Sequence, residues 1–132
     1  MTKPYALIIE DDPKLGVIFQ MALQQAGVET DVDQSGKHFS AKLAGPPPAL
    51  VILDIHLPYA SGMEIFEQIR SNASWAKAIV IIATADLFLS KSLEGRADYV
   101  LIKPVSVARI MNIVTSRWPE LTSSVLLPNK EG

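Results

Sequence analysis

The sequence predicts an α/β domain built on a doubly wound, five-stranded parallel sheet with helices on both faces. Four short aliphatic runs carry this prediction. None of them alternates with polar residues, and such runs are typical of strands buried on both faces. Segments with the apolar spacing of helices separate the runs, and strands that alternate with helices form a parallel sheet. The four runs lie at 6–9, 50–53, 79–83 and 100–102.

The first helix is predicted directly after the first run. Asp12 is suited to be its N-cap, Pro13 its first helical residue and Gly27 its end. Residues 28–32 follow with alternating apolar and polar residues, which predicts a weaker edge strand with one face in water. The apolar stripe of the helix consists of Leu15, Ile18, Phe19, Ala22, Leu23 and Ala26.

Four further helices complete the pattern. Prolines 46–48 close the second, and Ser61 and Glu64 have the capping-box spacing that opens the third. The fourth is short, and the fifth begins at Ser106 and is stopped by Pro119. These helices are expected at about 36–43, 61–72, 87–94 and 106–118.

Length and composition limit the classes of protein. The 132 residues allow one domain, expected over 1–119, and the tail at 120–132 is too short for an effector domain. A loose terminus is the simplest interpretation of this tail, although Val125-Leu126-Leu127 could pack back on the body or contact a partner. No signal peptide and no apolar run long enough to span a membrane are found.

Charge and cysteine content limit the partners and the chemistry. Twelve basic and fourteen acidic residues give a net charge of −2, which argues against direct nucleic-acid binding or an anionic membrane surface. The chain has no cysteine, which excludes disulfides, thiolate metal sites and cysteine catalysis. This fits a reducing compartment, and a cytoplasmic location is expected.

Ionisable side chains follow three of the four buried strands, and a hydroxyl follows the other. In open α/β sheets, ligands bind beyond the carboxyl ends of the strands. If the strand order is 2-1-3-4-5, the acidic residues after the first strand lie beside Asp54, with Thr84 and Lys103 on its other side. The strand-end segments are Glu10-Asp11-Asp12, Asp54, Thr84 and Lys103-Pro104.

This set of side chains predicts phosphoryl chemistry with a hard cation. Crowded carboxylates need a counter-charge, which Lys103 or a divalent ion can supply. Oxygen ligands without thiolates favour Mg²⁺, with Mn²⁺ in its place. Asp54 could attack a phosphoryl group to give an acyl phosphate, while Lys103 and Thr84 stabilise the transferring oxygens. Each residue alone has a simpler interpretation as a cap or strand terminator, but the combination is much rarer by chance.

Five motifs in order resemble the receiver domain of two-component response regulators. The likeness covers about residues 4–118, and the intervals between the motifs suit that family. It implies the order 2-1-3-4-5, as in the chemotaxis receiver. The motifs are Leu7-Ile8-Ile9-Glu10-Asp11-Asp12, Asp54-Ile55-His56-Leu57-Pro58, Gly62, Ala83-Thr84-Ala85 and Lys103-Pro104.

The resemblance implies a role for each matching residue. Asp54 would be the phosphorylated aspartate. Asp11 would contact Mg²⁺ directly and Glu10 mainly through water, while the backbone carbonyl of His56 adds a further ligand. Thr84 and Lys103 would bind the phosphoryl group, and Lys103-Pro104 would be a cis peptide. Asp12 would cap the helix.

The resemblance also implies partners. A histidine kinase or a histidine phosphotransfer protein would donate the phosphoryl group, and a downstream protein would receive the signal. The receiver would catalyse only its own phosphorylation and dephosphorylation, and His56 and Asp86 would tune the lifetime of the phosphate. Whether the chain forms a homodimer through its fourth helix, fifth strand and fifth helix is left open.

The sequence departs from the family pattern on its output side. Nineteen positions separate Thr84 from Lys103, some three fewer than is usual, so the fourth helix should be short or irregular. Val100 stands where the family has a switch aromatic, and Tyr99 lies one residue earlier. Since one position swaps the face of a strand, either a bulge restores Tyr99 or the usual coupling is missing. Arg96 also replaces a common glycine.

Three alternative functions would use a similar fold. A haloacid-dehalogenase-type phosphatase needs a second aspartate two residues after the nucleophile, where this chain has His56. A flavodoxin-like flavoprotein needs a hydroxyl- and glycine-rich phosphate loop, and Glu10-Asp11-Asp12 would repel that phosphate. A receiver that acts as a docking or dimerisation module without phosphorylation is opposed by Asp11, Asp54, Thr84 and Lys103 but stays open.

Overall fold

A computed structural model describes residues 3–121 and shows one five-stranded parallel sheet. The strand order is β2-β1-β3-β4-β5, which confirms the predicted doubly wound fold. The strands are β1 (Tyr5–Ile9), β2 (Glu29–Asp33), β3 (Leu50–Asp54), β4 (Ile79–Thr84) and β5 (Tyr99–Ile102). The helices are α1 (Pro13–Gln25), α2 (Phe39–Lys42), α3 (Gly62–Ser71), α4 (Leu87–Leu93) and α5 (Val107–Arg117).

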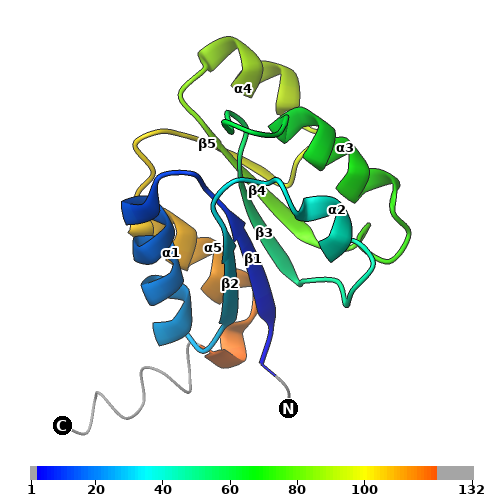
Figure 1. Ribbon diagram of the computed structural model, residues 1–132. Helices are drawn as coiled ribbons and strands as arrows, with labels where there is room; N and C mark the ends of the chain where they lie inside the picture. The colour runs from blue at the N-terminus through cyan, green and yellow to red at the C-terminus, as the bar shows by residue number, and fades with distance from the viewer. Residues whose placement is uncertain (1–2, 122–132) are drawn as a thin grey trace, which may run out of the picture.

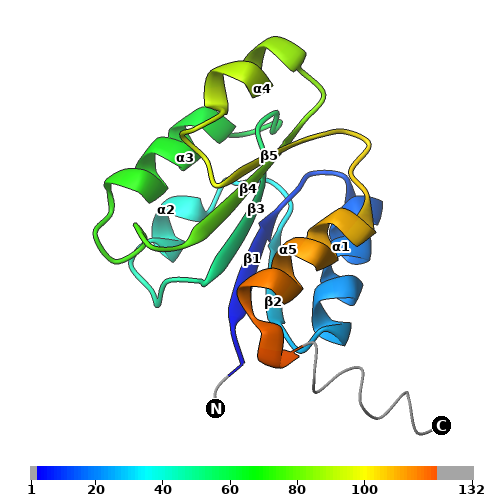
Figure 2. The same ribbon diagram turned by 180° about the vertical axis from the view of Figure 1, so that it is seen from behind.

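Helices cover both faces of the sheet, as Figures 1 and 2 show. Helices α1 and α5 lie on one face, and α2, α3 and α4 lie on the other. Alternate residues of each strand therefore face two separate cores. In β3, Val51 and Leu53 pack toward α2 and α3, while Leu50 and Ile52 pack toward α1 and α5. This double burial is the physical reason why the strands read as unbroken aliphatic runs.

The predicted helix boundaries are set by caps. The side chain of Asp12 accepts hydrogen bonds from Lys14 N and Leu15 N, as predicted for an N-cap. Ser61 and Ser106 cap α3 and α5 in the same way. After α1, Gly27 has φ +92°, which favours glycine over any residue with a side chain.

The second helix is shorter than predicted. Residues 36–43 were expected to be helical, but α2 spans only Phe39–Lys42. Gly36 has φ +71°, and its N–H bonds to the carboxylate of Asp33, so the chain forms a turn there. His38 stands at the N-cap without a side-chain hydrogen bond. The edge strand predicted at 28–32 is present one residue later.

The fifth strand settles which residue stands at the switch position. Strand β5 pairs with β4 in unbroken register from Ile81–Tyr99 to Thr84–Ile102, so no bulge restores Tyr99. Tyr99 packs toward α1 and α5, whereas Val100 packs in the core under α3 and α4. Val100 therefore occupies the place of the family aromatic. The short fourth helix is formed, and it buries Leu93.

In the described part, no helix is long and apolar enough to cross a membrane. The predicted division into a domain over 1–119 and a tail over 120–132 stays a prediction, and Val125-Leu126-Leu127 lies outside the described residues.

Candidate functional site

The predicted site residues stand where strands end at one edge of the sheet. Glu10 follows β1, and its N–H donates to Asp33 O at 3.2 Å, which continues the ladder with β2. Asp54 closes the neighbouring strand β3, and Thr84 closes β4. Lys103 follows β5, with its N–H donating to Thr84 O at 2.9 Å. Strands β1 and β3 flank the switch point of the doubly wound sheet, where ligands of such folds bind.

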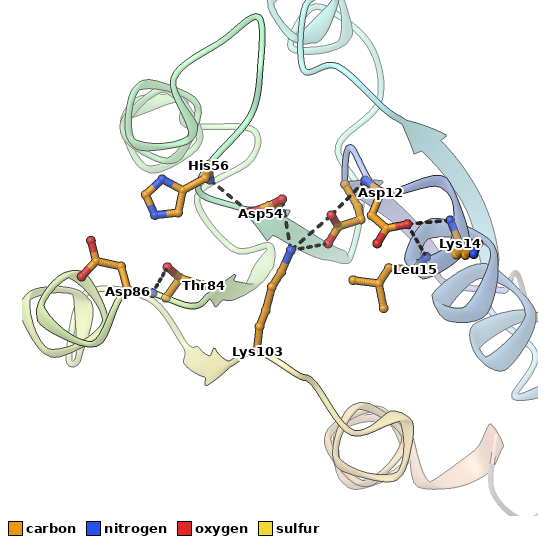
Figure 3. Close-up of polar contacts among 9 residues, drawn as sticks. Asp12, Lys14, Leu15, Asp54, His56, Thr84, Asp86 and Lys103 are labelled. Atoms are coloured by element: carbon orange, nitrogen blue, oxygen red, sulfur yellow. Dashed lines mark hydrogen bonds and ion pairs between the residues drawn. The ribbon is translucent and has the colours of Figure 1, made fainter.

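Lys103 brings the ends of three strands together (Figure 3). Its Nζ lies 3.2 Å from Glu10 Oε1 and 3.2 Å from Asp54 Oδ2. Both carboxylates are buried, whereas the lysine side chain is partly exposed. The Lys103–Pro104 bond is cis, as predicted. One ammonium group thus forms ion pairs with both carboxylates.

The acidic residues form a cluster that suits a cation. Glu10, Asp11 and Asp54 each offer a carboxylate oxygen, and these oxygens lie within 4.8 Å of one another. Glu10 Oε1 is buried and, although it lies within ion-pair distance of Lys103, it accepts no hydrogen bond. An oxygen-only donor set of this kind fits Mg²⁺ or Mn²⁺.

The environment pushes the pKa values of the two buried carboxyl groups apart. Burial raises the pKa of Glu10 to about 7, and the charge of Asp54 adds to this, while the Asp12 N–H and Lys103 act against it. Burial also opposes ionisation of Asp54. Its side-chain contact with Asp11 and the His56 N–H nevertheless hold the pKa of Asp54 below its ordinary value. Asp54 is therefore the more readily ionised member of the pair, which suits a nucleophile.

The raised pKa of Glu10 predicts that its contribution to stability falls as pH rises. The folded state holds this proton more tightly than the unfolded chain, so folding weakens from about pH 4.5 to about pH 7. Above that pH the cost reaches about 3 kcal/mol at most. Without metal, Glu10→Gln is expected to raise the free energy of unfolding by about 1–3 kcal/mol at about pH 8 and to change it little at about pH 5.

Urea unfolding followed by tryptophan fluorescence measures this difference. Glu29→Gln, at an exposed position of β2, is the matched control and should show no such pH dependence. A Glu10→Gln variant no more stable than wild type above pH 7 would contradict the assignment.

Backbone N–H groups donate the hydrogen bonds that involve the remaining predicted residues. The His56 N–H donates to Asp54 Oδ1 at 3.0 Å, a contact that the sequence did not reveal. Thr84 is buried, and its Oγ1 accepts from Asp86 N at 3.0 Å. Asp86 in turn caps α4 by accepting from Leu89 N. In Figure 3 the side chains of His56 and Asp86 lie on the side of Asp54 away from Asp12.

The structure thus gathers Glu10, Asp11, Asp54 and Lys103 in one cluster. Two aspartates outside this cluster, buried Asp33 and exposed Asp98, stabilise the fold instead. Asp33 accepts the N–H groups of Ser35 and Gly36 in the loop after β2. Asp98, which is exposed, accepts hydrogen bonds from Arg70 and from the backbone N–H of Val80. Asp33 stabilises a local turn, and Asp98 contacts residues that are distant in sequence. No sequence pattern reveals either role.

Comparisons with known proteins identify the family. A family model described as the response regulator receiver domain matches residues 6–115. The transcriptional regulatory protein QseB of Haemophilus influenzae is 34% identical over 105 residues, which cover 79% of this chain and 48% of QseB. The phosphate regulon transcriptional regulatory protein PhoB of Rhizobium meliloti is 30% identical over 131 residues, covering 93% and 57%. The chain spans about half the length of these relatives.

Solved structures share the fold. The chemotaxis response regulator CheY4 of Vibrio cholerae superimposes with a TM-score of 0.76 at 21% identity, covering 87% of this chain and 98% of CheY4. A CheY-like response regulator receiver domain protein of Methanospirillum hungatei gives 0.76 at 23% identity, with 92% and 98% covered. Together with the family model, which matches most of the chain, these findings show that the chain belongs to the response regulator receiver domain family of two-component systems.

Proposed function

We propose that Asp54 accepts a phosphoryl group from a histidine kinase or a histidine phosphotransfer protein in a Mg²⁺-dependent reaction. The observation that carries this proposal is the position of Lys103 Nζ, 3.2 Å from both Glu10 Oε1 and Asp54 Oδ2. A purely structural lysine would need no cluster of three carboxylates at the switch point. The cytoplasm is the proposed location of the exchange.

In the proposed step, an Asp54 carboxylate oxygen attacks the phosphorus of a phosphorylated histidine. The new P–O bond forms as the P–N bond breaks, and the leaving imidazole nitrogen keeps the electron pair and takes up a proton. Lys103 places a positive charge beside Asp54 Oδ2. This charge would stabilise the negative charge that develops on the phosphoryl oxygens during transfer. Thr84, at the end of β4, is the proposed hydrogen-bond donor to the phosphoryl group.

The acidic cluster is the proposed metal site. Asp11, Asp54 and the backbone carbonyl of His56 would hold the ion directly, with Glu10 acting mainly through water. A bound Mg²⁺ or Mn²⁺ supplies neutralisation of the phosphoryl oxygens. Binding favours the ionised form of Glu10, which offsets the effect of burial on this group.

The phosphorylated domain would signal by contacts with another protein. Phosphorylation biases a two-state surface rather than creating a new one. The alternative is a receiver that docks or dimerises without phosphorylation. This alternative is supported by Val100, which stands where the family has its switch aromatic. A downstream protein, or a second copy of the chain in a homodimer, would provide the contact.

Labelling by a small acyl phosphate tests the proposal. With Mg²⁺ present, the intact mass is expected to rise by one phosphoryl group, and hydroxylamine should remove it. Asp54→Ala and a chelator should each abolish the adduct. Asp31→Asn, which removes the ion pair with Lys42 on the edge strand β2, is the matched control and should be labelled normally. An adduct that survives in Asp54→Ala refutes the assignment. If neither the small donor nor any kinase gives an adduct, the result favours the docking module.

A further inference from the structure

Helix α1 carries a second apolar face that the fold leaves open. Phe19 and Leu23 point into the core shared with α5. On the outward side, Val17, Ile18 and Met21 are 50%, 45% and 58% exposed. Residues three and four apart are neighbours on a helix, so these three form one patch, which we call the α1 patch. An exposed apolar patch of this kind usually marks a contact surface.

The described chain ends next to this helix. Residue Leu121 packs into the core shared by α1 and α5. A Cβ built on Gly27 would lie 3.2 Å from Leu121 Cδ2, so Leu121 sits at the C-terminal end of α1. Figures 1 and 2 show the last coloured residues, after α5, beside that end of α1.

The sequence beyond Leu121 has the composition and length to reach the patch. The polar residues 122–124 are followed by Val125-Leu126-Leu127 and then a proline. Met21 lies six residues before Gly27, or about 9 Å along the helix axis. Four extended residues span about 13 Å, so a segment of this length is long enough to reach from Leu121 to the level of Met21.

We propose that Val125-Leu126-Leu127 of the same chain docks on the α1 patch. The apolar side chains then cover Val17, Ile18 and Met21, and the tether through Leu121 keeps the segment at a high effective concentration. A partner that binds the α1 patch would compete with this segment. The contact itself requires no phosphorylation.

Disulfide trapping tests the contact. Because the chain has no native cysteine, only the two introduced thiols can react. The pair Met21→Cys with Leu126→Cys is expected to form an intramolecular disulfide at least about tenfold faster than Asn112→Cys with Leu126→Cys, because docking raises the local concentration of the two thiols. Asn112 is exposed on α5 and nine residues before Leu121, so it offers a similar reach without an apolar patch. Equal rates overturn the proposal, and a covalent dimer assigns the patch to a second copy instead.

A second measurement leaves the patch intact. Methyl-labelled methionine gives one NMR signal for each of the four methionines, Met1, Met21, Met63 and Met111. Leu126→Ser is expected to shift the Met21 signal and to leave the Met63 signal in place, since Met63 packs on the opposite face of the sheet. An unmoved Met21 signal overturns the docking.

Discussion

Replacing Lys103 by methionine is expected to slow phosphoryl uptake at Asp54 by about 10²–10³-fold, the usual cost of removing one group that stabilises charge in a transition state. The methionine keeps the length of the side chain but removes the ammonium group that lies 3.2 Å from Asp54 Oδ2. The rate of labelling by a small acyl phosphate, measured by intact mass, gives the effect directly.

The matched control for this variant is Lys77→Met. Lys77 is exposed in the segment between α3 and β4, away from the carboxyl edge of the sheet, so its loss should leave the rate unchanged. Circular dichroism establishes that both variants are folded. A Lys103→Met protein that labels as fast as wild type would show that the lysine only neutralises the two carboxylates and takes no part in transfer.

Replacing Gly62 by alanine is expected to destabilise the fold by about 3 kcal/mol or more, because overpacking against backbone cannot be relieved by a rotamer change. A Cβ at this position would lie 2.4 Å from Ile55 O and 2.5 Å from Ile55 Cα. Ile55 directly follows Asp54, so any backbone shift that accommodates the methyl group also displaces the site. Urea unfolding gives the loss of stability, and acyl phosphate labelling gives the effect on the site.

Gly45→Ala is the matched control for the glycine variant. There the nearest atom to the added methyl group would be Lys42 O at 3.5 Å, which is an ordinary contact. Its effect should stay within about 0.5 kcal/mol. Equal stability of the two alanine variants would contradict the close approach of α3 to the backbone after β3.

The strands and the site were predictable from sequence for the same physical reason. A strand buried on both faces must be aliphatic throughout, so its first polar residue marks the carboxyl edge of the sheet. Asp54 and Lys103 stand out by this rule. The order of the strands then brings them together, and the ion pairs of Lys103 with Glu10 and Asp54 agree with that prediction.

Features that depend on local backbone geometry were less predictable. The positive φ of Gly36 and the hydrogen bonds to Asp33 shorten α2, and neither leaves a periodic signal in the sequence. The alternation of side chains in a strand left Tyr99 and Val100 as the two candidates for the switch position. Only the observed register of β5 against β4 decided between them. The hydrogen bond from the His56 backbone to Asp54 is independent of the residue type at position 56, which explains why it was missed.

A crystal structure with Mg²⁺ and a beryllium fluoride analogue of the phosphoryl group tests the central claim most directly. The analogue is expected on an oxygen of Asp54, within hydrogen-bond distance of Lys103 Nζ and Thr84 Oγ1, with the ion held by Asp11 and Asp54. A fully bound analogue on any other residue, or an ion held away from Asp11 and Asp54, would contradict the account.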